Sequence, residues 1–188
     1  MFNNPSRKIL LTSAGFETKT ISDAFLKFAG KEPREIKVLF IPAAADSPGA
    51  IAVLPKCMND LLNIDIPETN IKVFDLHRFM PSEELSAFDA VYFTGGNTGY
   101  LLERINSTGF NKPFNEFVNT GGVYIGVSAG SIIAAGNLPN NLGYLKADLR
   151  VHTKTGTDSG IFENDAVSQI DLTDKNAIAI DGDVYEII

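Results

Sequence analysis

The feature that most constrains the fold is an alternation of short apolar runs with amphipathic stretches. The apolar runs predict strands over residues 8–12, 36–41, 71–76, 90–94 and 123–125. Between them, apolar residues recur at helical spacing, for example over residues 21–29 and 51–62, where Pro55 is expected to kink the first turn. Strands that are apolar on both faces and separated by helices are typical of a parallel sheet covered on both sides. The sequence therefore predicts an α/β fold, a three-layer sandwich with a mostly parallel central sheet.

The last part of the chain shows a different pattern. Residues 149–152 and 177–180 are predicted strands, and residues 184–188 are expected to pair with the second of these as a hairpin. We therefore expect one domain over residues 1–188, with antiparallel strands added to the parallel sheet. In such folds the active site lies at the carboxyl ends of the parallel strands.

Composition excludes several classes of function. The 188 residues include 16 Lys plus Arg against 23 Asp plus Glu, and a net charge of −7 disfavours nucleic acid and anionic membranes as partners. No apolar run approaches the ~20 residues needed to span a bilayer, and the apolar stretch at residues 9–11 is too short for a signal peptide. The single cysteine, Cys57, excludes an internal disulfide, and neither H-E-x-x-H nor a His/Cys cluster indicates a metal. We expect a soluble cytoplasmic protein.

The sequence Gly126-Val-Ser128-Ala-Gly130 is the clearest chemical signal. This G-x-S-x-G pattern follows a predicted strand and precedes a helix-compatible run, which is the setting of a nucleophile elbow. Glycines on both sides allow a sharp turn that exposes the serine. The amide of Ala129, at the start of the helix, is placed to hold a developing oxyanion. A tight turn whose serine only caps the helix is the structural alternative.

A nucleophilic serine needs a base, and the chain offers only His77 and His152. Both follow predicted strands, and spacing alone does not choose between them. An acid must then orient the imidazole. The candidates downstream of the serine are Asp148, Asp158, Glu163, Asp165 and Asp181.

A glycine-rich loop, Gly95-Gly96-Asn97-Thr98-Gly99, also follows a strand and opens a helix. It matches neither the dinucleotide fingerprint nor the P-loop. Its amides are better suited to complete an oxyanion hole beside the serine. Cys57, in a predicted helix, is most simply a buried apolar residue.

These segments together resemble the peptidase E (aspartyl dipeptidase) family of serine peptidases. The resemblance lies in residues 91–98 (VYFTGGNT), in residues 124–131 (YIGVSAGS), in the histidine 24 residues after the serine and in the closing segment 172–182. Cyanophycinases belong to the same wider group, whose fold resembles that of class I glutamine amidotransferases. The resemblance covers most of the chain and implies this fold and a hydrolytic activity that requires no cofactor.

The resemblance also implies a role for each matching residue. Ser128 corresponds to the nucleophile, His152 to the general base and Asp181 to the acid that orients the imidazole. The amides of Gly96 and Ala129 correspond to the oxyanion hole.

Two further residues are expected to bind substrate, Asn97 of the glycine-rich loop and Arg150. The family's dipeptidase grips an N-terminal Asp with an arginine downstream of the histidine, and this chain has none after Arg150. Arg150 lies two residues before His152, and residues two apart in a strand face the same side, so we expect both to line one cleft. The family's usual aromatic residue after the base is replaced by Thr153.

The sequence thus predicts a serine hydrolase that cleaves short peptides, in the manner of a dipeptidase, through an acyl-enzyme. Two alternatives stay open. One is an esterase or amidase acting on a small non-peptide substrate, and the other is a non-catalytic binding module on the same fold. The expected partner is a small peptide, with no nucleic acid or membrane, and a homodimer is allowed.

Overall fold

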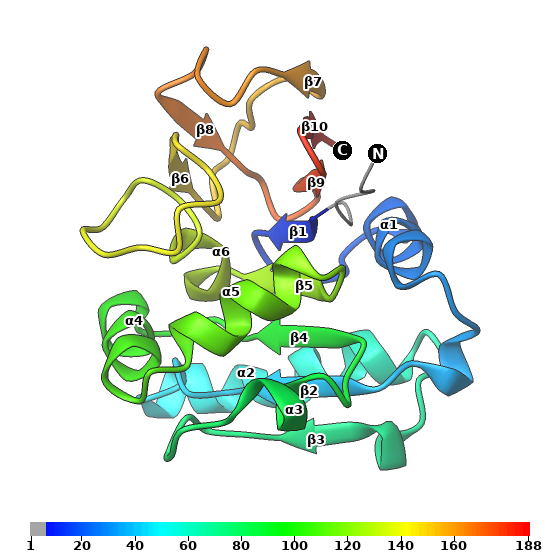
Figure 1. Cartoon of the computed structure of the whole chain (residues 1–188). Coiled ribbons are helices and arrows are strands. Elements are labelled where there is room, and N and C mark those ends of the chain that lie inside the picture. The colour runs from blue at the N-terminus through cyan, green and yellow to red at the C-terminus, as the bar shows by residue number, and fades with distance from the viewer. Residues whose placement is uncertain (1–6) are drawn as a thin grey trace, which may run out of the picture.

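Figure 1 shows the computed structural model, which describes residues 7–188 as an α/β fold around one large sheet. Its strands follow the order β3-β2-β4-β5-β1-β9-β10-β7. The first five in this order run parallel: Ile71–Val73 (β3), Val38–Ile41 (β2), Ala90–Phe93 (β4), Val123–Val127 (β5) and Lys8–Thr12 (β1). The remaining three run antiparallel to their neighbours: Ala177–Asp181 (β9), Val184–Ile187 (β10) and Gly160–Phe162 (β7).

Helices cover both faces of the sheet and complete three layers (Figure 1). The helices of one face are Lys19–Ala29 (α1) and Pro48–Leu62 (α2). Those of the other face are Ser82–Leu85 (α3), Thr98–Ser107 (α4), Asn111–Asn119 (α5) and Ala129–Ile132 (α6). Two short 3-10 helices span Pro33–Glu35 and Glu68–Asn70. Successive side chains of β4 point to opposite faces of the sheet. Tyr92 packs into the core under α1 and α2, and Phe93 packs into the core under α4 and α5. The predicted α/β sandwich is confirmed.

The local sequence explains where the helices begin and end. The Thr18 side chain caps α1 by accepting from the amide of Ile21, and Gly30 ends this helix in the left-handed conformation with φ 61°. Ser47 caps α2 in the same way, so this helix begins at Pro48, three residues before the predicted start. Pro55 consequently lies inside the helix and not in its first turn as predicted.

The later part of the chain adds to the parallel sheet. The predicted hairpin is confirmed, since β10 pairs with β9 from Val184 opposite Asp181. The predicted strand at residues 149–152 is Asp148–Arg150 (β6), which pairs in parallel with Gln169–Asp171 (β8) in a small separate sheet. β7 and β8 were not predicted.

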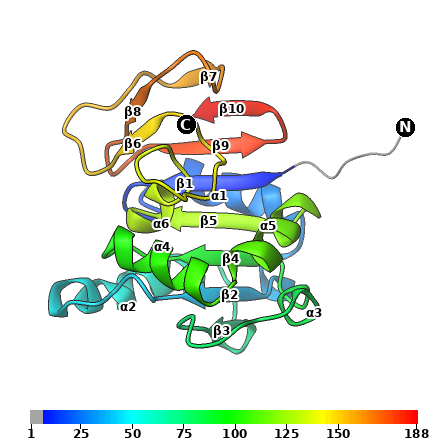
Figure 2. The same cartoon turned by 60° about the vertical axis from the view of Figure 1, so that its left-hand side comes forward.

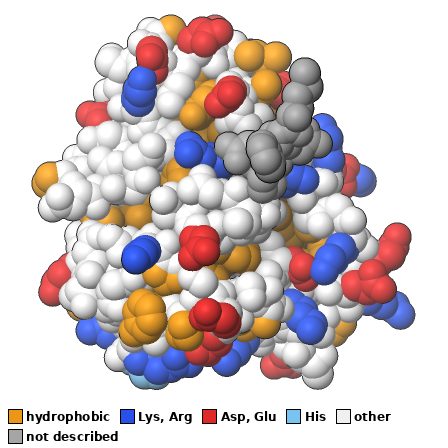
Figure 3. Space-filling view, viewed as in Figure 1, with side chains coloured by type: hydrophobic (Ala, Val, Ile, Leu, Met, Phe, Trp, Pro, Cys, Tyr) orange, Lys and Arg blue, Asp and Glu red, His pale blue; other side chains and the backbone are white. Residues whose placement is uncertain are grey.

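Figure 2 shows α6 and α4 at the end of the sheet toward which β5 and β4 point. Side chains of both charge signs are spread over the face drawn in Figure 3. Across the described residues 7–188, no helix is long and apolar enough to cross a membrane. The same part of the chain contains no cluster of three or more His, Cys, Asp or Glu side chains that could hold a metal ion.

Candidate active site

Ser128 occupies a sharp turn between β5 and α6. Its backbone has φ 50° and ψ −107°, a conformation that non-glycine residues rarely adopt. Hydrogen bonds fix this conformation, because the Ser128 amide donates to Thr12 O at 3.0 Å and the Ser128 carbonyl accepts from Ser131 N at 2.9 Å. The turn also requires glycine at position 126, since a Cβ there would lie 2.3 Å from the carbonyl oxygen of Gly130. The G-x-S-x-G sequence therefore folds as the strained strand–turn–helix of a nucleophile elbow.

His152 lies beside this serine. Its Nε2 is 3.2 Å from Ser128 Oγ, within hydrogen-bond reach. His152 follows β6, and its backbone is left-handed with φ 56°. The structure thus brings together the two residues that the resemblance paired. His77 lies elsewhere, after β3 at the edge of the sheet, where its ring nitrogen contacts the carboxylate of Asp75.

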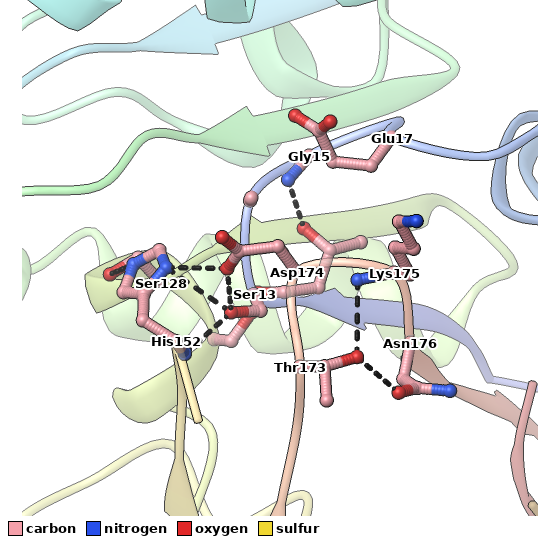
Figure 4. A network of polar contacts seen from close by, with 12 residues as sticks. Ser13, Gly15, Glu17, Ser128, His152, Thr173, Asp174, Lys175 and Asn176 are labelled. Carbon is pink, nitrogen blue, oxygen red and sulfur yellow. Dashed lines mark hydrogen bonds and ion pairs between the residues drawn. The ribbon is translucent and has the colours of Figure 1, made fainter. Parts of the chain in front are cut away.

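The acid that contacts His152 is Asp174, which was not among the predicted candidates. Asp174 Oδ1 lies 2.7 Å from His152 Nδ1 (Figure 4). Burial alone would raise the pKa of Asp174, but hydrogen bonds from His152 and Ser13 outweigh it, so the pKa lies below its usual value. The carboxylate is therefore ionised at neutral pH and able to orient the imidazole.

The prediction of Asp181 as this acid is wrong for a topological reason. β9 runs antiparallel to β1, so Asp181 pairs with Lys8 whereas Ala177 pairs with Thr12. Thr12 is the end of β1 that lies beside the serine elbow, and four residues along a strand correspond to about 13 Å. Asp181 therefore lies at the opposite end of the strands from Ser128. A sequence signal for Asp174 was present: it lies three residues before the predicted strand 177–180. If that strand is antiparallel to the others, it begins at the end of the sheet where the active site is expected.

The glycine-rich loop, residues 95–99, lies against the serine. A Cβ at Gly95 would be 3.2 Å from Ser128 Cβ, which shows how closely the two segments approach. Gly96 has φ 138°, and a Cβ there would lie 2.0 Å from Ala44 O, so only glycine fits. Ala129 is buried as the first residue of α6. The structure places both predicted residues next to Ser128, and the role of their amides stays a prediction.

Asn97 has a structural role, and its predicted contact with substrate stays a prediction. It caps α4, with Oδ1 accepting from Tyr100 N at 3.0 Å, and its Nδ2 donates to Asp46 Oδ2 at 2.7 Å. Both ends of the side-chain amide are thus occupied by the protein.

Arg150 pairs with Asp171 and is not among the residues that line the cavity with Ser128 and His152. Its Nε donates to Asp171 Oδ1 at 2.7 Å, and a second guanidinium nitrogen pairs with the other carboxylate oxygen. Asp171 is the cross-strand partner of Arg150 in the small β6-β8 sheet. The expected shared face with His152 fails because β6 ends at Arg150 and His152 has left-handed backbone. The alternation of strand side chains therefore does not extend to the histidine.

A cavity of about 240 Å³ opens beside Ser128 and His152. Apolar side chains of α2 form one wall: Ala50, Val53, Leu54 and Cys57. Lys56 is the cation among the lining residues, and its Nζ donates to Ala14 O at 2.6 Å and pairs with Glu17. Cys57 is buried as predicted, and burial raises the pKa of its thiol.

A buried carboxyl group, Asp60, forms hydrogen bonds with Tyr92 and with the loop that follows β1. Asp60 Oδ2 accepts from Tyr92 OH at 2.6 Å and from the Phe16 amide at 3.1 Å. Burial raises the pKa of Asp60 despite these hydrogen bonds. The contacts fix the loop that follows β1, which also carries Ser13.

The fold and the site define an α/β protein with a serine at a nucleophile elbow and a Ser–His–Asp series of contacts. The chain belongs to peptidase family S51, a family of serine-type peptidases, whose sequence profile matches residues 9–144. An uncharacterized peptidase of Pasteurella multocida is 28% identical over 134 residues, which cover 70% of this chain and 62% of the relative. Peptidase E of Shewanella amazonensis is 33% identical over 97 residues, or 51% of this chain and 39% of the relative.

The matched segments thus span less than two thirds of these relatives. Two solved structures share the fold. A candidate peptidase E from Listeria monocytogenes superposes with a TM-score of 0.73 at 22% identity, over 97% of both chains. A peptidase from an acI-B1 actinobacterium superposes with a TM-score of 0.67 at 17% identity, over 100% of this chain and 89% of the other. At these identities the likeness concerns the fold alone.

Proposed function

We propose that this chain is a serine peptidase that cleaves short peptides, with Ser128 as nucleophile, His152 as general base and Asp174 as the orienting acid. The observation that carries the proposal is the continuous series of contacts from Ser128 Oγ through both ring nitrogens of His152 to Asp174, at 3.2 and 2.7 Å. Membership of family S51 supports the same chemistry.

The reaction follows from this geometry. Ser128 Oγ attacks the scissile carbonyl carbon while its proton passes to His152 Nε2. The amides of Gly96 and Ala129 stabilise the oxyanion of the tetrahedral intermediate. When the carbon–nitrogen bond breaks, His152 returns the proton to the leaving amine. Water then attacks the ester carbonyl carbon of the acyl-enzyme while His152 accepts a proton from it. The bond from this carbon to Ser128 Oγ breaks, His152 returns the proton to Ser128 Oγ, and the acyl product leaves as a carboxylic acid.

The cavity beside Ser128 favours substrates with an uncharged residue next to the scissile bond. Its α2 wall is apolar, and an apolar side chain gains free energy on leaving water. The charge of Lys56 is already balanced by Glu17, and that of Arg150 by Asp171. An aspartate side chain would therefore lose hydration without gaining an unpaired cation. This preference differs from that of the family's dipeptidase for an N-terminal Asp, and it agrees with the absence of an arginine after Arg150 in the sequence.

We also place the activity in the cytoplasm, because the one cysteine leaves the chain without an internal disulfide that an oxidising compartment would favour. Fractionation of cells expressing the native protein tests this placement.

The central test uses a fluorophosphonate probe and a dipeptide library on purified protein. The wild type should be labelled and should hydrolyse peptides, and Ser128→Ala should lose both with a drop of about 10⁴–10⁶ in kcat while it stays folded. A wild type that is labelled and hydrolyses esters, but does not hydrolyse peptides, would favour an esterase. A folded wild type that is not labelled would indicate a binding module.

A further inference from the structure

Ser13, the residue directly after β1, contacts both His152 and Asp174. The His152 backbone amide lies 2.7 Å from Ser13 Oγ, and Asp174 Oδ1 lies 2.9 Å from the same oxygen (Figure 4). Ser13 is fully buried, with 0% of its surface exposed. One buried hydroxyl group therefore joins two residues that are 22 positions apart in the chain.

The chemistry of the partners fixes the direction of each hydrogen bond. The amide of His152 can only donate, so Ser13 Oγ accepts from it, and the carboxylate of Asp174 can only accept, so the single Ser13 proton goes there. The 3.4 Å contact between Ser13 Oγ and His152 Nδ1 then has no hydroxyl proton left. The imidazole must carry its own proton on Nδ1 for Asp174, which leaves Nε2 free to accept from Ser128.

The two residues that Ser13 joins need such support. The side chains of His152 and Asp174 are 52% and 54% exposed, and both lie outside the strands. His152 also has left-handed backbone, which is costly for a residue with a Cβ. Surface segments of this kind are mobile unless other contacts fix them.

Ser13 itself is well anchored. The Gly15 amide donates to Thr12 Oγ1 at 3.1 Å, and the next amide, that of Phe16, donates to the buried Asp60. Lys56 adds a third contact to this loop through Ala14 O. The loop after β1 is thus attached to the central sheet and to α2, the elements that also carry or surround Ser128.

We propose that Ser13 is a positioning residue of the active site. It holds the His152 backbone and the Asp174 carboxylate in the positions from which the imidazole reaches Ser128. The inference rests on the proposed peptidase function. Ser13 contacts the His152 backbone amide and the Asp174 carboxylate, and its hydrogen bonds go to neither Ser128 Oγ nor His152 Nε2. Its loss displaces the base and the acid together, and a misplacement of about 1 Å can cost on the order of 10²-fold in rate.

The test compares second-order rates of fluorophosphonate labelling and of peptide hydrolysis in a set of variants. Ser13→Ala should lose about 10²-fold in both rates, and Ser13→Thr, which keeps the hydroxyl group, should recover most of that loss. Thr108→Ala is the control, since it also removes a hydrogen-bonding hydroxyl group: Thr108 Oγ1 donates to Arg104 O at 2.7 Å at the C-terminal end of α4. The control should keep labelling within about threefold of the wild type, whatever its melting temperature.

A double-mutant cycle separates positioning from general destabilisation. If Ser13 acts through the acid and the base, Ser13→Ala should cost at least about fivefold less in an Asp174→Ala background than in the wild type. Equal losses in both backgrounds, or an equal loss in Thr108→Ala, would overturn the inference. Labelling of Ser13→Ala at the wild-type rate would also overturn it and leave the peptidase assignment intact. Failure of the wild type itself to label would instead refute the proposed function.

Discussion

His152 and Asp174 lie 22 residues apart in the sequence, yet Nδ1 of the first and Oδ1 of the second are 2.7 Å apart. The contact depends on the order of the sheet. β1 lies between β5, which leads to Ser128, and β9, which Asp174 precedes by three residues. Because β9 is antiparallel to β1, the segment before β9 reaches the same edge as the segment after β5. Asp174 therefore precedes the start of a strand, whereas Ser128 follows the end of one.

The first prediction concerns this acid. Asp174→Asn should lower kcat by roughly 10²–10⁴-fold, because an amide no longer stabilises the tautomer and charge that His152 needs. Asp181→Asn is the matched control at the other end of β9, opposite Lys8, and should leave kcat unchanged within about twofold. Steady-state hydrolysis by both purified variants decides between them. A larger loss in the Asp181 variant would return the role to that residue.

The second prediction concerns the base. His152→Ala should reduce the labelling rate by about 10⁴–10⁶-fold, since the serine would lose its proton acceptor. His77→Ala removes the other histidine of the chain, which contacts Asp75 away from Ser128, and should label like the wild type. Comparison of labelling time courses at equal protein concentration makes the measurement. Loss of labelling in the His77 variant alone would contradict the assignment.

The third prediction concerns specificity. The wild type should cleave Ala-X and Leu-X dipeptides at least about tenfold faster, in kcat/KM, than Asp-X dipeptides, because the cations near the site are already paired. Arg150→Ala should leave this ratio unchanged. Lys56→Met should widen it, because Glu17 would then repel an acidic substrate without compensation. Preferential cleavage of Asp-X by the wild type, lost in Lys56→Met, would show instead that Lys56 binds the substrate carboxylate.

The fourth prediction concerns pH and the buried Asp60. Its pKa is raised in the folded protein, so folding favours the protonated carboxyl group, and this contribution to stability is lost as pH rises through the folded-state pKa. Asp60→Asn keeps an oxygen that accepts from Tyr92 and Phe16 but cannot ionise. The variant should melt at a higher temperature than the wild type at pH 8, and the difference should shrink toward pH 4. Thermal melts across this range measure the effect. A difference that grows as pH falls would contradict the burial argument.

Local sequence determined much of the fold. The apolar runs specified the central parallel strands because β2, β4 and β5 are buried on both faces. Caps such as Thr18 and Gly30 specified the ends of α1. The elbow around Ser128 was also predictable, since the glycines, the preceding strand and the following helix are all neighbours in the chain. In each case the cause and its structural effect lie within a few residues.

The residues that complete the site depended on tertiary structure. Asp174 and Asp181 are both acidic residues near a predicted strand, and only the antiparallel direction of β9 decides which one faces His152. Arg150 was expected beside the base, and its pairing with Asp171 exists only because β6 and β8 form a separate sheet. Ser13 gave no local signal, because a serine after a strand acquires its contacts from segments more than 130 residues away. The sequence by itself therefore determined the strands and the elbow that carries Ser128, while the three-dimensional order and direction of the strands decided which side chains surround this serine.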